Sequence, residues 1–144
     1  MYFEMEYKYP KERYIQILAK DYYKGYEFFV VSYGTHPCAY VSIPEGKPYH
    51  EAKSWDDVNI ICHGGCTYAS TDKEFEHIAT CTEENTTVIG WDYGHYNDFS
   101  GRYLSDFSTT LFETKRWTTK EMITECKEVI EQLHFLEHPE LIYE

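Results

Sequence analysis

Short apolar runs follow one another through the first two thirds of the chain, and their composition predicts β-strands. The clearest run is YEFFVVSY at residues 26–33, which consists mostly of β-branched and aromatic residues. Gly34 and Pro37 then indicate a tight connection, and residues 38–43 return beside the first run as a β-hairpin. Residues 13–19 fit either a strand or a short helix. The predicted strands are residues 1–9, 13–19, 26–33, 38–43, 58–68 and 86–93.

A helical period replaces this pattern near the C-terminus. Thr118 fits the N-cap of a helix and Glu121 its third position, which together form a capping box. The apolar residues that follow lie on one stripe of a helix, so this stripe is expected to face the core over residues 118–133. The stripe consists of Met122, Cys126, Val129, Ile130 and Leu133.

The segments between these elements are polar and lack a clear period. Residues 54–57 are expected to form one helical turn and residues 69–85 a loop. Residues 94–116 are a longer stretch without periodicity, and loops of this length in a compact domain are often functional. We therefore predict a single α+β domain over residues 1–144, with an antiparallel sheet of five or six strands and a C-terminal helix packed on one face.

The charge of the chain restricts its partners. Its 25 acidic and 13 basic residues give a net charge of −12. This field repels nucleic-acid backbones and anionic membrane surfaces, so neither non-specific nucleic-acid binding nor membrane binding is expected. No apolar run reaches the ~20 residues of a membrane-spanning helix. Five basic residues could still form a local phosphate site: Lys47, Lys53, Arg102, Lys115 and Arg116.

The five cysteines are an odd number, and the N-terminal segment lacks the features of a secretion signal, so a reducing cytoplasm is expected. Cys62 and Cys66 stand in a C-x3-C spacing with His63 between them. A zinc site usually adds a second pair of Cys or His ligands, and no such pair follows here. Buried, unreactive thiols are therefore the expectation, and neither a metal nor a cofactor is predicted.

Two short segments combine Gly, His and aromatic residues where predicted strands are interrupted or end. The first is CHGGCTY at residues 62–68, and the second is GWDYGH at residues 90–95. Glycine allows a positive φ or a close approach of the backbone to a ligand, so we expect the two segments to meet at one end of the sheet. The predicted ligand site consists of His63, Gly64, Gly65, Asp92 and His95, with Tyr68, Trp91 and Arg102 as neighbours.

Asp92 and Asp98 leave alternatives open. A carboxylate beside His63 or His95 could complete a metal site or orient an imidazole as a base. Alternatively, the two aspartates cap turns and the histidines bind local carbonyl groups. The chain has no G-x-S-x-G motif, phosphate-binding loop or dinucleotide fingerprint, which disfavours a classical nucleotide-hydrolysing fold. The tryptophans are expected in the core or as lids: Trp55, Trp91 and Trp117.

Four segments in order resemble a family of small proteins encoded by phages and prophages, especially in Firmicutes and related bacteria. The resemblance extends over residues 26–133. It departs from the family at Cys66, where Leu or Ile is usual, and at Asn97, where Gly is usual. The matching segments are GTHPCAYVSIPEG (34–46), ICHGGCTYAS (61–70), VIGWDYGHYNDF (88–99) and RWTTKEMITECKEVIEQL (116–133).

The resemblance implies a phage anti-defence protein in the cytoplasm of the host cell, and it carries no catalytic residue over. The leading hypothesis is a homo-oligomeric binding protein that sequesters a small nucleotide-derived immune signal, such as a cyclic ADP-ribose or a cyclic nucleotide, without cleaving it. One alternative is a hydrolase that uses His63, Asp92 and His95. The other is an acidic inhibitor that binds a host defence protein directly.

Overall fold

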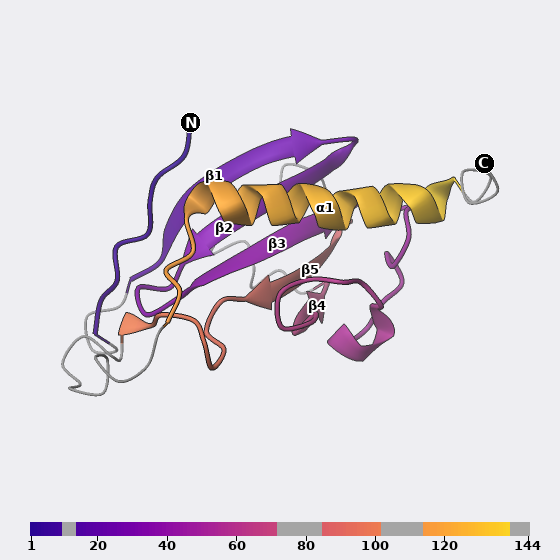
Figure 1. Ribbon diagram of the computed structural model, residues 1–144. Coiled ribbons are helices and arrows are strands. Elements are labelled where there is room, and N and C mark those ends of the chain that lie inside the picture. The colour runs from indigo at the N-terminus through magenta and orange to yellow at the C-terminus, as the bar shows by residue number, and fades with distance from the viewer. Residues whose placement is uncertain (10–13, 72–84, 102–113, 139–144) are drawn as a thin grey trace.

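A computed structural model of the protein describes residues 1–9, 14–71, 85–101 and 114–138. Within these ranges the chain forms a five-stranded antiparallel sheet and one α-helix, which confirms the predicted α+β class (Figure 1). The strands are β1 (Gln16–Tyr23), β2 (Tyr26–Ser32), β3 (Pro37–Ile43), β4 (Tyr68–Ser70) and β5 (Thr87–Asp92). Their order across the sheet is β1-β2-β3-β5-β4.

The hairpin between β1 and β2 has a turn of two residues. Lys24 and Gly25 both have a positive φ, of 48° and 86°, between the end of β1 and the start of β2. Two consecutive left-handed residues match the twist of the strands they join, so a two-residue turn suffices. β2 then pairs with β3, which confirms the predicted hairpin, and Phe29 lies opposite Tyr40.

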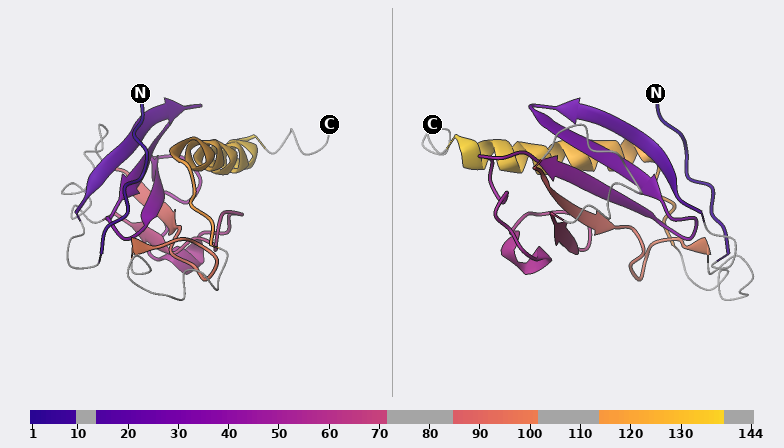
Figure 2. Two further views of the ribbon diagram at one scale, coloured as in Figure 1. Left: turned by 60° about the vertical axis from the view of Figure 1, so that its left-hand side comes forward. Right: turned by 180° about the vertical axis from the view of Figure 1, so that it is seen from behind.

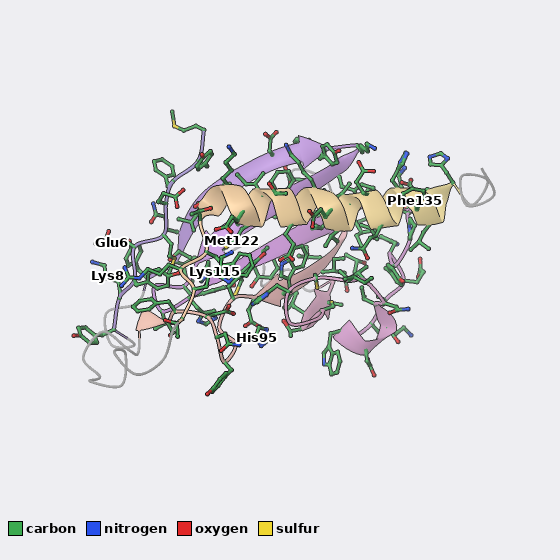
Figure 3. All side chains as sticks on the ribbon, in the orientation of Figure 1. Glu6, Lys8, His95, Lys115, Met122 and Phe135 are labelled. Carbon is green, nitrogen blue, oxygen red and sulfur yellow. The ribbon has the colours of Figure 1, made fainter. Side chains whose placement is uncertain are left out.

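The helix α1 (Thr119–Glu137) begins and packs as predicted. The Thr118 hydroxyl accepts from the Glu121 amide at 3.2 Å, and the Thr118 amide donates to the Glu121 carboxylate at 3.0 Å. All five residues of the predicted apolar stripe have an exposed fraction of 0%. Figure 2 shows the helix lying along one face of the sheet, and Figure 3 shows Met122 on the side of the helix that faces the strands.

Both faces of the sheet are apolar. On the side of α1, Phe28 and Val30 of β2 join the core beneath the helix, whereas Phe29 and Val31 belong to a second cluster on the opposite face. All seven residues of β2 are therefore buried, which explains a run without polar alternation. In β5 the predicted face with Ile89 and Trp91 packs toward α1.

The predicted strand at residues 1–9 is wrong. Among the residues that the structure describes, two backbone bonds tie this segment to the sheet region: Phe3 N donates to Leu18 O at 2.8 Å, and Lys8 N donates to Gly34 O at 2.7 Å. The acceptors lie on β1 and in the connection between β2 and β3, so the segment crosses over two elements and cannot form a ladder with either.

The predicted strand at residues 58–68 is also wrong, except for Tyr68 at its end. Gly64 and Gly65 have φ values of 70° and 81°, and two left-handed residues in succession reverse the chain. Before this reversal, the backbone is bound to the helix instead of a strand. Ile61 N donates to Gln132 Oε1, and Gln132 Nε2 donates to Ile61 O, each at 2.7 Å.

The connections follow the predictions only in part: residues 69–70, predicted as the start of a loop, belong to β4. The short helix η1 (Trp55–Asp57) confirms the predicted turn at residues 54–57. Trp91 lies in the core and Trp117 is half-buried, but Trp55 is 58% exposed, so its expected burial is wrong. Much of the predicted loops at residues 69–85 and 94–116 lies outside the described residues. Among the helices of the described chain, none is long and apolar enough to cross a membrane.

Candidate functional site

A tight turn after the segment bound to Gln132 presents His63. Gly65 N donates to Cys62 O at 3.0 Å, which closes the turn, and the positive φ at both glycines determines its direction. The turn lies next to the loop that follows β5, at the end of the sheet where β5 stops and β4 begins. His95 is on that loop, on the side of the N-terminal half of α1 (Figure 3).

Asp98 is the buried centre of this region, with an exposed fraction of 3%. Its Oδ2 accepts from His63 Nε2 at 2.7 Å and from the backbone amide of His95 at 3.0 Å. Its Oδ1 accepts from Trp117 Nε1 at 2.8 Å. Because an ionised carboxylate only accepts, His63 donates from Nε2. Its Nδ1 has no hydrogen bond to any of the described residues and can serve a ligand.

Aromatic rings surround the His63 imidazole. The Tyr93 ring is parallel to it, with centroids 5.0 Å apart and an interplanar angle of 7°. The Trp117 ring lies 4.8 Å away at 57°, and the His95 ring lies 5.5 Å away at 69°. Stacked and edge-on rings at these distances stabilise one orientation of the imidazole. We call His63, Tyr93, His95, Asp98 and Trp117 the histidine cluster.

His95 has a carboxylate neighbour of its own. Its Nε2 lies 3.4 Å from Asp92 Oδ1, and this nitrogen is buried without a hydrogen bond in the described structure. Asp92 Oδ1 also accepts from Gly94 N at 3.0 Å, and Thr67 Oγ1 donates to its Oδ2 at 3.3 Å. The two aspartates therefore cap turns, and each also lies beside an imidazole.

Gly64 allows the close approach of the two segments, and its replacement tests that approach. A Cβ atom at Gly64 would lie 2.0 Å from His95 Nε2, whereas a Cβ atom at Gly65 would have no atom within 4 Å. Both positions have a positive φ, so alanine at either costs about 1–2 kcal/mol of backbone strain. We expect Gly64→Ala to lower the free energy of unfolding by clearly more than Gly65→Ala and to displace the His95 ring.

Chemical denaturation of the two variants, together with NMR shifts of the His95 ring protons, measures this difference. Gly65→Ala is the matched control because it introduces the same strain without the contact. Equal losses of stability and an unchanged His95 signal in Gly64→Ala would contradict the packing described above.

Glu125 of α1 is hydrogen-bonded to the cluster and to the strand before it. Its Oε1 accepts from Trp91 Nε1 at 2.9 Å and from the Tyr93 hydroxyl, and its Oε2 accepts from the backbone amide of His63 at 3.2 Å. Burial raises the pKa of the Tyr93 phenol, so this group stays protonated and remains a donor. One carboxylate thus connects the helix, β5 and the turn at His63.

The structure brings four of the predicted site residues into contact or near-contact: His63, Gly64, Asp92 and His95. Gly65 lies in the same turn but has open space around it. Two of the remaining three do not share this surface. Trp91 is 1% exposed and lies in the core, and Tyr68 lies on the opposite face of the sheet, edge-on to Tyr40. Arg102 lies outside the described residues.

The predicted site does not include four residues of this region: Tyr93, Asp98, Trp117 and Glu125. The sequence places Asp98 near the histidines and predicts Trp117 as a core or lid residue, but no local pattern links Asp98 to Trp117. Glu125 does carry a signal, because it lies three residues after Met122 and four before Val129, on the flank of the apolar stripe. An acidic residue at such a position needs buried partners.

The thiols near the turn are not poised for metal binding. Burial raises the pKa of Cys62 to about 12 and raises the pKa of Cys66, so both stay protonated near neutral pH. Cys66 Sγ donates to Tyr68 O at 3.3 Å. Within the described ranges, no group of three or more His, Cys, Asp or Glu side chains is arranged to hold a metal ion.

A positive charge adjoins the cluster. The Lys115 ammonium lies 3.9 Å from the centroid of the Trp117 ring and 2.6 Å from Glu121 Oε2. The cluster therefore offers aromatic faces, two imidazoles and one ammonium group. Such a set can stack against a flat ring, bind an anion, or transfer a proton through the His63–Asp98 pair.

Comparison of the chain with protein-family models, with curated proteins and with solved structures gives no match.

Proposed function

We propose that this protein binds and sequesters a small nucleotide-derived signal at the histidine cluster, without cleaving it. The observation that carries the proposal is the grouping of His63, His95, Trp117 and Lys115 at one end of the sheet. A tryptophan face can stack a base, and imidazole and ammonium groups can bind phosphate. These are the two chemical features that every cyclic nucleotide and cyclic ADP-ribose carries.

The resemblance to small phage and prophage proteins supports the setting of this function. A protein that removes an immune signal would act in the cytoplasm of the infected host cell. A homo-oligomer suits this role, because a second chain can cover a ligand that lies on exposed loops. The function is thus that of a phage anti-defence protein.

A second candidate function is favoured by one distance. His63 Nε2 lies 2.7 Å from the buried carboxylate of Asp98, which is the arrangement that orients a histidine as a general base. A hydrolase of the same signals would use His63 as base, Asp98 to orient it, and His95 beside them. Asp98 thus takes the place of Asp92 in this version of the hydrolase hypothesis.

One experiment separates these functions. The protein is incubated with cyclic ADP-ribose isomers and with cyclic dinucleotides, free ligand is measured, and the protein is then denatured by heat to release what it holds. We expect depletion of a ligand and its recovery intact. A new product would establish the hydrolase instead. If no candidate ligand is depleted, sequestration of these signals is rejected in favour of the acidic inhibitor of a host protein.

Paired tryptophan variants place the ligand on the molecule. Trp117→Ala removes the ring that adjoins His63 and should weaken binding roughly 10-fold, since stacking on one base is worth about 1–3 kcal/mol. Trp55→Ala is the control, because Trp55 is exposed on η1 and away from the cluster. Circular dichroism checks that both variants fold. Equal affinities of the two variants would exclude the histidine cluster as the site.

A further inference from the structure

A hollow lies near the C-terminal end of α1, where Lys47 pairs with Glu137. Its volume is about 460 Å³, within the ~300–1,000 Å³ of typical small-molecule sites. The loop between β3 and η1 forms most of its wall. The residues that matter for its chemistry are Lys47, Tyr49, His50, Glu51, Lys53 and Asp57.

This hollow is separate from the histidine cluster. Lys47 pairs with Glu137 in the last turn of α1, whereas the amide of His63 donates to Glu125. These two glutamates are twelve residues apart, which corresponds to about 18 Å along a helix. A ligand in the hollow therefore does not touch the histidine cluster.

Three basic side chains line the hollow in a protein with a net charge of −12. The Lys53 side chain is exposed and forms no ion pair with any residue in the described ranges. His50 Nε2 lies 2.8 Å from Asn85 O and must donate, because a carbonyl only accepts. This hydrogen bond raises the pKa of His50. The Lys47 side chain is 37% exposed, and its ammonium group pairs with Glu137.

The acidic residues of the lining compete weakly for these cations. Asp57 Oδ2 accepts from the backbone amides of Lys53 at 2.9 Å and Ser54 at 3.2 Å, so its charge is engaged within the turn. Glu51 lies 3.3 Å from His50 Nδ1, but its side chain is 98% exposed and directed into solvent. An anion with more than one negative charge can displace such a contact.

Tyr49 supplies an aromatic wall in a strained conformation. Its φ of 68° is rare for a bulky residue. Its hydroxyl donates to Asn59 O at 3.1 Å, and its half-buried ring packs against the core. Strained residues of this kind persist where the surrounding structure holds them and are concentrated at ligand sites. The hydrogen bond to Asn59 and the contact with the core hold the Tyr49 side chain, and Tyr49 is one of the residues that line the hollow.

We infer that this hollow binds a small ligand that carries a phosphate group and a flat ring, of the nucleoside monophosphate class. Lys47, His50 and Lys53 would contact the phosphate, and the Tyr49 ring would contact the base. This site uses none of the residues of the histidine cluster, so it goes beyond the proposed function.

Titration of the full-length protein with adenosine monophosphate at low salt tests the inference, with amide NMR shifts as the readout. We expect saturable shifts at residues 47–53 with a Kd of about 1 mM or lower. Lys53→Glu should weaken binding at least ~10-fold. Lys120→Glu is the matched control, because Lys120 is an exposed lysine on α1 and its reversal changes the net charge equally. We expect less than about a 2-fold effect from it.

Each contrary result overturns a defined part of the inference. Absence of shifts up to about 10 mM ligand would reject the site. Equal weakening by Lys53→Glu and Lys120→Glu would reduce the binding to a general effect of charge. Ribose 5-phosphate binding as tightly as adenosine monophosphate would remove the role of Tyr49. Trp117→Ala should leave this titration unchanged, which keeps the result distinct from a failure of the proposed function.

Discussion

Val129→Asp will cause the largest loss of stability, about 3–5 kcal/mol in the free energy of unfolding. Val129 has an exposed fraction of 0% and lies in the core between α1 and the sheet. An unpaired charge in such a place costs about 3–5 kcal/mol, against a total free energy of unfolding of ~5–15 kcal/mol for a typical domain. Circular dichroism and urea titration measure the loss. The matched control is Thr124→Asp, which puts the same charge on an exposed position of α1.

The control variant should stay within about 0.5 kcal/mol of the wild type, as exposed substitutions usually do. A folded Val129→Asp protein with an unchanged midpoint of unfolding would mean that α1 does not pack on the sheet through this stripe.

Glu125→Ala will cause the second largest loss. It removes an acceptor shared by three donors: Trp91 Nε1, the Tyr93 hydroxyl and the backbone amide of His63. Trp91 Nε1 keeps the Tyr93 hydroxyl as a second acceptor at 3.0 Å, so two donors lose their partner. A buried donor left without a partner costs about 1–3 kcal/mol, so we expect a loss of roughly 3 kcal/mol in the free energy of unfolding. Urea denaturation followed by tryptophan fluorescence measures it.

Two further variants calibrate this result. Glu125→Gln keeps one acceptor oxygen and should lose clearly less stability than Glu125→Ala. Glu128→Ala removes an exposed glutamate from the same helix and should change little. If all three variants unfolded at the same urea concentration, the buried carboxylate would not be a structural support of the histidine cluster.

The sequence is most informative where a local pattern and the tertiary fold agree. The helix could be predicted with its N-cap and its buried apolar residues, because the capping box and the apolar period depend only on neighbours within the helix. The hairpin of β2 and β3 could be predicted for a similar reason, since a short connection forces the two strands to pair.

Other segments depend on contacts that no local pattern reveals. Residues 1–9 alternate like a strand, yet their backbone bonds go to two separate places: Leu18 O on β1 and Gly34 O in the connection between β2 and β3. The double glycine at Gly64 and Gly65 suggested a bulge within a strand, whereas the two positive φ values produce a complete reversal. The difference lies in the number of consecutive left-handed residues, which the sequence alone leaves open.

The histidine cluster could be predicted only in part, because some of its contacts depend on the path of the loops. Glycine next to histidine in two segments correctly suggested that His63 and His95 lie close together. Which aspartate faces which imidazole could not be predicted, because both Asp92 and Asp98 lie within three residues of His95. The path of the loop makes that choice, and it puts Asp98 under His63. Trp117 joins the cluster through a tertiary contact over a sequence separation of 54 residues from His63.

The paired hydrogen bonds between Gln132 and Ile61 have a consequence for how this fold can diverge. A helix side chain here plays the part of a neighbouring strand, so the segment before the turn at His63 is held by α1, whereas Thr67 after the turn is bound to Gly90 of β5. A descendant with another residue at position 132 could preserve every strand pairing and still shift the imidazole. Conservation of the architecture and conservation of the histidine cluster are therefore separable in this protein, and the residue at position 132 is one marker of the difference.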